Sequence, residues 1–349
     1  MKIDTTRDGN EMRAREGDLI RTSANVVFDV KGTVHPKNKI IAFPRFIPST
    51  DGARKGNDTT YGKVYSLRDR FQYLQKNHPD LVVYDVVFGE TMCEVPTDQI
   101  VQLYKPAEKL VQLRAAKNLT VLEAKALKLA VTLKEKANIP WSAIGISGSI
   151  MAGLTIDTSD IDPLVYGEEN SRKAYKTLQE LRLIEDSGFK AYTQTELRTL
   201  FDFRSKDTQM SFEDFQKVEN RKAFQGMFMG TDYFVRFLKD WNDENEQYGD
   251  VCYQNSGYCK IKATIVNSEN ALFTPCNYQI CNVAVLAGPE LEHITEVVSF
   301  RGRFCQHAFE NERIEAQGKA ELVTNKKNGL TYYRLILGNK PQDYMVLSH

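Results

Sequence analysis

The sequence predicts an α+β protein made of a central α/β domain and two β-rich flanking domains. Three observations lead to this expectation. Short apolar runs separated by Gly, Pro and Asn occupy the chain up to residue 104, helical and strand-like patterns alternate over residues 105–240, and strand follows strand over residues 241–349. We therefore expect three domains with the boundaries 1–104, 105–240 and 241–349.

The first domain contains four strand-like runs, at residues 26–30, 39–43, 63–65 and 81–88. A polar hairpin or loop at 49–62 separates the second run from the third, and residues 67–76 have the pattern of a helix. This order of elements predicts a small sheet with a helix packed on it.

The central domain begins with a helix over residues 121–137. Thr120 is a good N-cap, Leu129 and Leu133 belong to an apolar stripe with helical spacing, and Pro140 prevents the helix from continuing. We expect a strand at 142–147, a turn at Gly148 and Ser149, a short helix, a strand at 160–166 and a helix at 172–183. A long helical stretch to about residue 228 and a strand at 233–238 would follow.

The last domain shows five strand-like runs, at residues 260–266, 278–286, 294–300, 313–323 and 332–337. Five strands of this length predict a small barrel or a sandwich. Basic residues such as Arg301 and Arg334 alternate here with aromatic residues such as Phe300 and Tyr333, a pattern that weakly favours contact with single-stranded nucleic acid.

Composition excludes several classes of protein. The 349 residues are 42% apolar and 26% charged, which is typical of soluble globular chains rather than of disordered or fibrous ones. Lys+Arg and Asp+Glu balance at 46 each, so the surface carries no general positive charge. No apolar run is long enough to cross a membrane and residues 1–17 lack a signal-peptide pattern, so we expect a cytoplasmic protein. The six cysteines are expected to be reduced.

The most informative motif is the Gly148-Ser149 turn, followed after ten residues by Asp160 and Asp162. Two aspartates at i and i+2 on a strand point to the same face, where they offer hard oxygen ligands to Mg²⁺. The turn, with Ser147 before it, allows a phosphate group to approach backbone N–H groups closely. The motif therefore predicts metal-assisted phosphoryl or nucleotidyl transfer.

This motif resembles the signature of the polymerase-β-type nucleotidyltransferase superfamily, in which a Gly-Ser turn precedes an Asp-x-Asp strand by a similar interval. The whole chain also resembles uncharacterised archaeal predicted nucleotidyltransferases, for example at residues 28–32 and 299–304. The resemblance implies a palm-like central domain, in which Asp160 and Asp162 bind metal. It further implies that Ser147, Gly148 and Ser149 bind the nucleotide.

The resemblance also implies a third carboxylate on a later strand. We favour Asp232, which opens the run 233–238; Glu244, Glu246 and Asp250 are the alternatives. Two positions depart from the superfamily. Ala152 stands where many relatives have an arginine, so that one phosphate contact must come from elsewhere, and Pro163 removes a backbone donor, which favours an edge strand or a bulge.

The expected function is therefore a nucleotidyltransferase that uses Mg²⁺ or Mn²⁺ to move an NMP from an NTP to a hydroxyl acceptor. RNA is the first candidate acceptor, and a protein or a small molecule is the second. The alternative is a non-catalytic module of the same fold that binds nucleotide or RNA in a regulatory role. The sequence does not distinguish oligomeric states.

Overall fold

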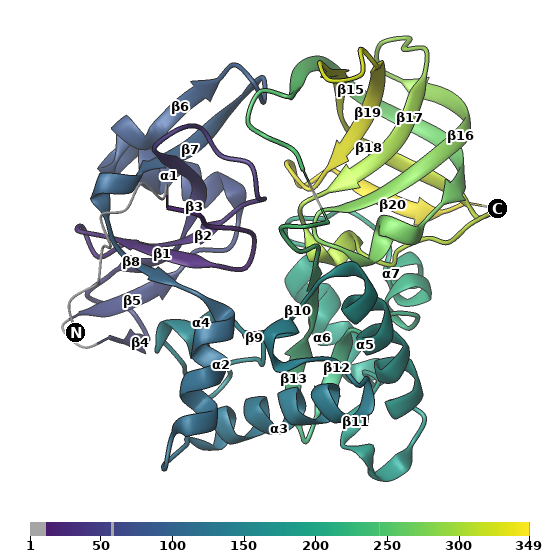
Figure 1. Ribbon diagram of the computed structural model, residues 1–349. Coiled ribbons are helices and arrows are strands. Elements are labelled where there is room, and N and C mark those ends of the chain that lie inside the picture. Colours follow the sequence, from purple (N-terminus) through teal and green to yellow (C-terminus); the bar gives the residue numbers. More distant parts are fainter. Residues whose placement is uncertain (1–11, 57–58, 244, 349) are drawn as a thin grey trace.

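The chain forms three regions that contact one another in the computed structural model, which describes residues 12–56, 59–243 and 245–348 (Figure 1). An N-terminal β region and a C-terminal β region stand side by side in this view, and a region of helices and short strands lies below them. The molecule is thus α+β with several separate sheets, as the sequence predicted. No helix in the described ranges has the length and apolar character needed to cross a membrane.

The N-terminal region is one sheet of eight strands with a helix packed on it. The strand order is β4-β5-β3-β2-β1-β8, with β7 paired to β3 and β6 to β7. Helix α1 (Leu67–Asn77) begins after Ser66, whose hydroxyl accepts the Asp69 N–H at 3.0 Å, and its Leu74 is buried against the sheet. The strands are β1 (Leu19–Thr22), β2 (Val27–Val30), β3 (Lys39–Pro48), β4 (Arg54–Lys55), β5 (Thr60–Lys63), β6 (Val82–Asp85), β7 (Glu90–Pro96) and β8 (Ile100–Tyr104).

The central region contains two three-stranded sheets and six helices. In the first sheet, β10 (Pro163–Tyr166) lies between β9 (Ile144–Ile146), to which it is antiparallel, and β14 (Arg236–Leu238), to which it is parallel. The second sheet has the order β11-β12-β13. The remaining elements are β11 (Phe189–Lys190), β12 (Gln225–Phe228), β13 (Thr231–Phe234), α2 (Pro106–Ala115), α3 (Val121–Lys136), α4 (Gly148–Ala152), α5 (Glu168–Leu181), α6 (Gln194–Arg204) and α7 (Phe212–Glu219).

Three expectations for this region are wrong in detail. The stretch to residue 228 is not one helical run, because Thr193 and Ser211 start separate helices α6 and α7, and a strand, β12, follows. The run 233–238 divides at Val235 into β13 and β14, which belong to different sheets. The strand expected at 160–166 begins only at Pro163, and it is a central strand rather than an edge, because a proline is tolerated as the first residue of a strand.

The C-terminal region is a closed barrel, one of the two forms that the sequence predicted. Each of five strands pairs with two others in the ring β15-β16-β17-β19-β18-β15, in which only β17 and β19 are parallel, and β20 adds to one end of β18. The strands are β15 (Val251–Asn267), β16 (Cys276–Ala287), β17 (Ile294–Ser299), β18 (Arg313–Asn325), β19 (Thr331–Leu337) and β20 (Tyr344–Leu347). All six cysteines of the chain are free thiols.

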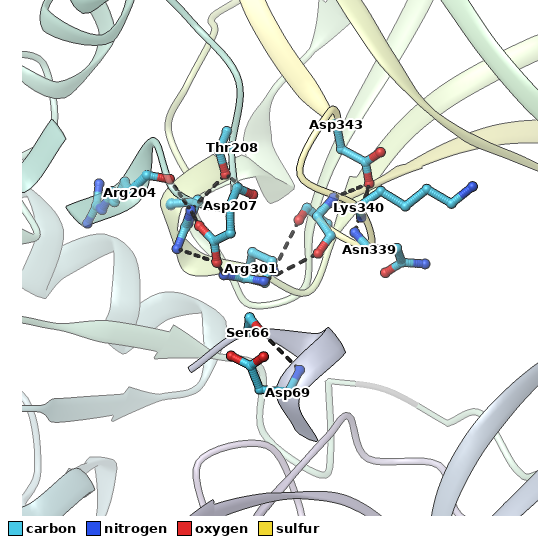
Figure 2. A network of polar contacts seen from close by, with 12 residues as sticks. Ser66, Asp69, Arg204, Asp207, Thr208, Arg301, Asn339, Lys340 and Asp343 are labelled. Carbon is cyan, nitrogen blue, oxygen red and sulfur yellow. Dashed lines mark hydrogen bonds and ion pairs between the residues drawn. The ribbon is translucent and has the colours of Figure 1, made fainter. Parts of the chain in front are cut away.

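The barrel is joined to the central region by a network around Asp207, shown in Figure 2. Its carboxylate accepts hydrogen bonds from Arg301, at 2.6 Å, and from Arg303. Arg303 also donates to the Thr208 hydroxyl at 2.7 Å and to the Arg204 carbonyl at 3.2 Å. Burial alone would raise the pKa of Asp207, but the two guanidinium groups hold it below its usual value. This loop between α6 and α7 therefore fixes the barrel in place.

We predict that Asp207→Ala lowers the free energy of unfolding by about 3 kcal/mol at pH 7, because it leaves two partly buried guanidinium groups without their counter-charge. The matched control is Glu213→Ala, since Glu213 also forms an ion pair, with Lys217 at 3.1 Å, but its side chain is 80% exposed. We expect this control to cost less than about 1 kcal/mol in urea unfolding. The cost of Asp207→Ala should shrink below pH 4, where the carboxylate is protonated in the unfolded chain. Equal losses for the two variants would contradict this account.

Candidate functional site

A cavity of about 1620 Å³ lies where the three regions meet. Its wall includes Arg45 and Arg70 from the N-terminal sheet and helix α1, Asp160 and Asp232 from the central region, and Arg334 from the barrel. Pockets for single small molecules have volumes of roughly 300–1,000 Å³. The cavity is therefore large enough for two reactants at once.

Two of the predicted acids flank a buried residue. Ile161 is fully buried, and its backbone pairs with the segment around Tyr233 as an isolated parallel bridge. The Ile161 N–H donates to the Asp232 carbonyl at 2.9 Å, and the Ile161 carbonyl accepts the Phe234 N–H at 3.0 Å. Because side chains alternate along an extended chain, Asp160 and Asp162 project on the side opposite to Ile161. The same bridge places Asp232 beside them.

The three carboxylates influence one another electrostatically. Burial, and then the charge of Asp160, raise the pKa of Asp162 to about 6. Burial raises the pKa of Asp232 as well, and the charge of Asp160 adds to this increase. The Tyr192 hydroxyl donates a hydrogen bond to the Asp232 carboxylate, which lowers its pKa. Such shifts identify a place where negative charge is concentrated and a cation would be stabilised.

The predicted Gly148 turn lies directly against Asp162. Gly148 has φ = +63°, and a Cβ atom at this position would overlap the Asp162 carboxylate. The Ser147 N–H donates to the Asp162 carbonyl at 2.9 Å, and the Ser147 hydroxyl donates to the Gly17 carbonyl at 2.7 Å. The Ser149 hydroxyl is buried and has no hydrogen-bond partner among the described residues. The glycine thus allows the turn and the second aspartate to approach closely.

The structure brings the predicted residues together but does not give them equal access to the cavity. Among the described residues, the cavity wall includes Asp160 and Asp232, whereas Asp162, Ser147, Gly148 and Ser149 are not part of it. The roles that the sequence assigned to these residues remain predictions. To bind a polyphosphate chain, the Gly148 turn would have to be open to the cavity. In this structure the turn is not part of the cavity wall.

The alternative third carboxylates have different surroundings. Glu246 lines the cavity, Asp250 pairs with Lys327 at 2.7 Å, and Glu244 lies outside the described residues. Asp232 is the alternative that is hydrogen-bonded, through its backbone, to the Asp160–Asp162 segment.

The acid residues fit a hard divalent cation by their chemistry, because all their donors are carboxylate oxygens. Within the described ranges, no three His, Cys, Asp or Glu side chains lie close enough to share an ion. Asp160 and Asp162 are the pair that would hold a metal, and Asp232 would have to approach them to complete the set.

The sequence did not single out several other residues of the wall. Lys63 and Arg45 come from the N-terminal sheet, Arg70 from α1 and Tyr192 from the segment before α6. They occur as isolated residues in unrelated elements, with no motif or spacing to mark them. Only the folded arrangement reveals that they face the acids.

The chain is similar to an archaeal protein along nearly its whole length. It is 31% identical over 337 residues to the uncharacterized protein MJ1086 of Methanocaldococcus jannaschii, and the match covers 94% of this chain and 96% of that protein. The chain therefore belongs to the same family as MJ1086. No protein-family model matches the chain, and no solved structure matches it.

We predict that Gly148→Ala destabilises the protein more than Gly153→Ala. Both glycines have positive φ, at +63° and +68°, but an added Cβ would meet Asp162 at the first position and no atom within 4 Å at the second. Gly153→Ala should cost about 1 kcal/mol of unfolding free energy from backbone strain alone. Gly148→Ala should cost at least about 2 kcal/mol, because overpacking is added to that strain. Equal costs in urea unfolding would show that the close contact with Asp162 is unimportant.

We predict that Asp162→Asn stabilises the protein at neutral pH. The pKa of Asp162 rises from 3.8 to about 6 on folding, so the folded state binds the proton more tightly and the stability of the wild type falls as pH rises through this range. Asn mimics the protonated side chain and should be more stable by about 1–3 kcal/mol at pH 7.5, with little difference below pH 4. Subtracting the two stability curves removes the contributions of groups that do not interact with Asp162. A difference that does not change with pH would contradict the prediction.

Proposed function

We propose that this chain is a nucleotidyltransferase that transfers an NMP from an NTP to a hydroxyl acceptor in the presence of Mg²⁺ or Mn²⁺. One observation carries the proposal: Asp160 and Asp162 flank the buried Ile161, whose backbone bridge places Asp232 beside them at the edge of a large cavity. This arrangement supports the interpretation of the central region as a palm-like domain. Membership of the MJ1086 family does not bear on the activity, because MJ1086 is itself uncharacterized.

The acids would have distinct roles. Asp160 and Asp162 would hold the divalent ion, which in this chemistry neutralises the charge that develops on the transferred phosphoryl group. Asp232 would complete the set of ligands and accept the proton of the attacking hydroxyl. Its raised pKa would make it a stronger base than an ordinary aspartate. Tyr192, which donates to the Asp232 carboxylate, would orient it.

The size of the cavity supports a reaction with two substrates. Asp160 and Asp232 lie on the wall contributed by the central region, and the barrel contributes a separate part of the wall. We propose that the nucleotide occupies the part beside Asp160 and that the acceptor enters along the barrel. RNA, a protein and a small molecule are the candidate acceptors.

The test is transfer of label from each [α-³²P]NTP in the presence of Mg²⁺ or Mn²⁺, with total RNA, with the protein alone and with a small-molecule extract as acceptors. We expect labelled product with the wild type and a loss of at least about 100-fold with Asp160→Asn, because one carboxylate ligand of the metal is removed. The matched control is Asp157→Asn, since Asp157 is exposed, lies in the same loop and is not part of the cavity wall.

Two outcomes would contradict the proposal. Transfer that survives Asp160→Asn unchanged would place the chemistry elsewhere or in a contaminant. Nucleotide or RNA binding without transfer to any acceptor, and without an effect of Asp160→Asn, would favour the alternative of a non-catalytic binding module.

A further inference from the structure

The cavity wall beside the acids carries an excess of positive charge. Five cationic side chains line this part of the wall together with two carboxylates, those of Glu16 and Asp29, and the charges of four of them act on Asp29. The cations come from separate elements, and four of the five belong to the N-terminal region: Lys31, Arg45, Lys63, Arg70 and, from β14, Arg236. The two carboxylates neutralise only part of this charge.

Two of the five cations have firm partners. Lys31 lies 2.8 Å from Asp29 and 3.1 Å from Glu16, and Arg236 lies 2.9 Å from the same Glu16 oxygen. Both carboxylates are largely buried, so these pairs are only weakly screened by solvent. Glu16 and Asp29 are therefore already occupied by Lys31 and Arg236.

Arg70 is buried without sufficient partners. It is only 8% exposed, its Nη1 is 4.0 Å from Asp29, and its buried Nε has no hydrogen-bond partner among the described residues. Burial and the neighbouring charge of Arg45 lower the pKa of Arg70 to about 10. Buried donors of an arginine are normally paired, and an unpaired one is costly. The described residues therefore leave this guanidinium group short of acceptors.

Arg45 and Lys63 act on acidic groups only from a distance. Neither side chain forms an ion pair within the described residues; instead, their cationic groups lie 5.4 Å and 5.0 Å from the centre of the Tyr65 ring. Tyr65 itself is 44% exposed and lines the cavity. A cation–π contact of this kind orients a cation without neutralising it.

A bulge in the N-terminal sheet directs Arg45 toward the site. Val27 pairs with Phe46 and the next residue, Phe28, pairs with Pro44, so Arg45 is the extra residue of β3 opposite β2. Bulges redirect a side chain and are common beside active sites. Phe46 itself packs with Met151 and Leu154 of the α4 segment, which fixes the bulge against the central region.

The uncompensated cations lie within electrostatic reach of the acids. The charges of Lys63, Arg236 and Arg45 lower the pKa of Asp162, although burial and Asp160 outweigh them. Arg54 anchors β4 to the loop before Asp160, because it donates to the Leu154 carbonyl and to the Ser159 hydroxyl. The N-terminal region is thus attached to the segment that carries the candidate metal ligands.

We propose that Arg45, Lys63 and Arg70 bind the polyphosphate chain of the nucleotide, so that the N-terminal region supplies the phosphate contacts of the site. This inference rests on the proposed function for the identity of the ligand as a nucleoside triphosphate. It explains why Ala152 can stand where an arginine was expected: the cations reach the site from β3, β5 and α1 instead. A polyphosphate beside Arg70 supplies a counter-charge to its guanidinium group and offsets the repulsion among the three cations.

The experiment measures binding separately from transfer. Inorganic tripolyphosphate and ATP are titrated calorimetrically into the full chain at 150 mM salt, without a divalent metal. We expect Arg45→Gln and Lys63→Gln each to weaken the binding of both ligands by about tenfold, since each removes a charge-assisted contact. Gln keeps much of the side-chain length, and circular dichroism together with the melting temperature verifies folding.

The matched control is Lys55→Gln. Lys55 is an exposed lysine on β4 of the same sheet and is not part of the cavity wall, so binding should change by less than about twofold. Arg45→Lys, which keeps the charge but loses the bidentate geometry, should bind more tightly than Arg45→Gln.

The outcomes separate this inference from the proposed function. Tripolyphosphate that does not bind the wild type, or that binds Arg45→Gln and Lys63→Gln as tightly as the wild type, overturns the inference even when label transfer is observed. Binding that depends on both residues, in a protein that transfers no label, supports the phosphate site and contradicts the proposed function.

Discussion

The backbone bridge at Ile161 determines where all three candidate carboxylates lie. Ile161 is fully buried, which forces its neighbours Asp160 and Asp162 to the opposite side of the chain. Its N–H and carbonyl are both used by the segment from Asp232 to Phe234, so the backbone of the third acid is tied to that of the first two. A buried apolar side chain and two backbone hydrogen bonds thus hold together a concentration of negative charge that would otherwise separate the strands.

That concentration of charge is balanced across the cavity rather than within the central region. The acids come from the central region, whereas Arg45, Lys63 and Arg70 come from the N-terminal region. Opposite charges on two separate structural regions stabilise a site only when the regions keep a fixed position. The contacts of Arg54 and the packing of Phe46 on α4 provide this here. A nucleotide with bound metal would complete the balance, since its cation faces the acids and its phosphates face the basic residues.

The sequence was sufficient for the features that local chemistry determines. The N-cap at Thr120, the helix that follows it and five of the six barrel strands follow from short patterns. The division of the run 233–238 at Val235 was missed, because it depends on which sheet each half joins. The position of Pro163 in a central strand was missed for a similar reason. The pairing partners of a strand are set by the tertiary fold, which can override local preference.

The residues of the candidate site also form two groups, those that could be identified from the sequence and those that could not. Asp160, Asp162 and Gly148 belong to one short motif and could be identified from their spacing. The basic half of the site could not, because Arg45 depends on a bulge, Arg70 on a helix and Lys63 on a strand end, and these lie far apart from the motif in the sequence. Nothing in a sequence of balanced charge indicates that Arg45 and Lys63 form no ion pair among the described residues or that Arg70 forms only a distant one.

The ion pairs of the barrel also bear on which acceptor could bind there. The sequence suggested that basic and aromatic residues of the barrel contact single-stranded nucleic acid, but four of those basic residues already have carboxylate partners. Asp207 pairs with Arg301 and Arg303, and Glu321 pairs with Lys319 and Arg334. Lys319 also reaches Glu90 of the N-terminal sheet at 2.6 Å. These four basic residues connect the three regions, and their charges are already largely neutralised by these ion pairs.

An RNA backbone gains most of its affinity from cations that are free to neutralise phosphates. Tyr253 of the barrel likewise already has partners on its ring. It stacks on Phe88 with ring centroids 5.8 Å apart, and the guanidinium carbon of Arg334 lies 3.9 Å from the centroid of the Tyr253 ring. Stacking of a base on Tyr253 would require one of these contacts to open. If the proposed function holds, the barrel's part of the wall therefore suits an acceptor hydroxyl on a compact molecule or a protein side chain better than an extended RNA strand, and Arg45, Lys63 and Arg70 lie on the side proposed for the nucleotide.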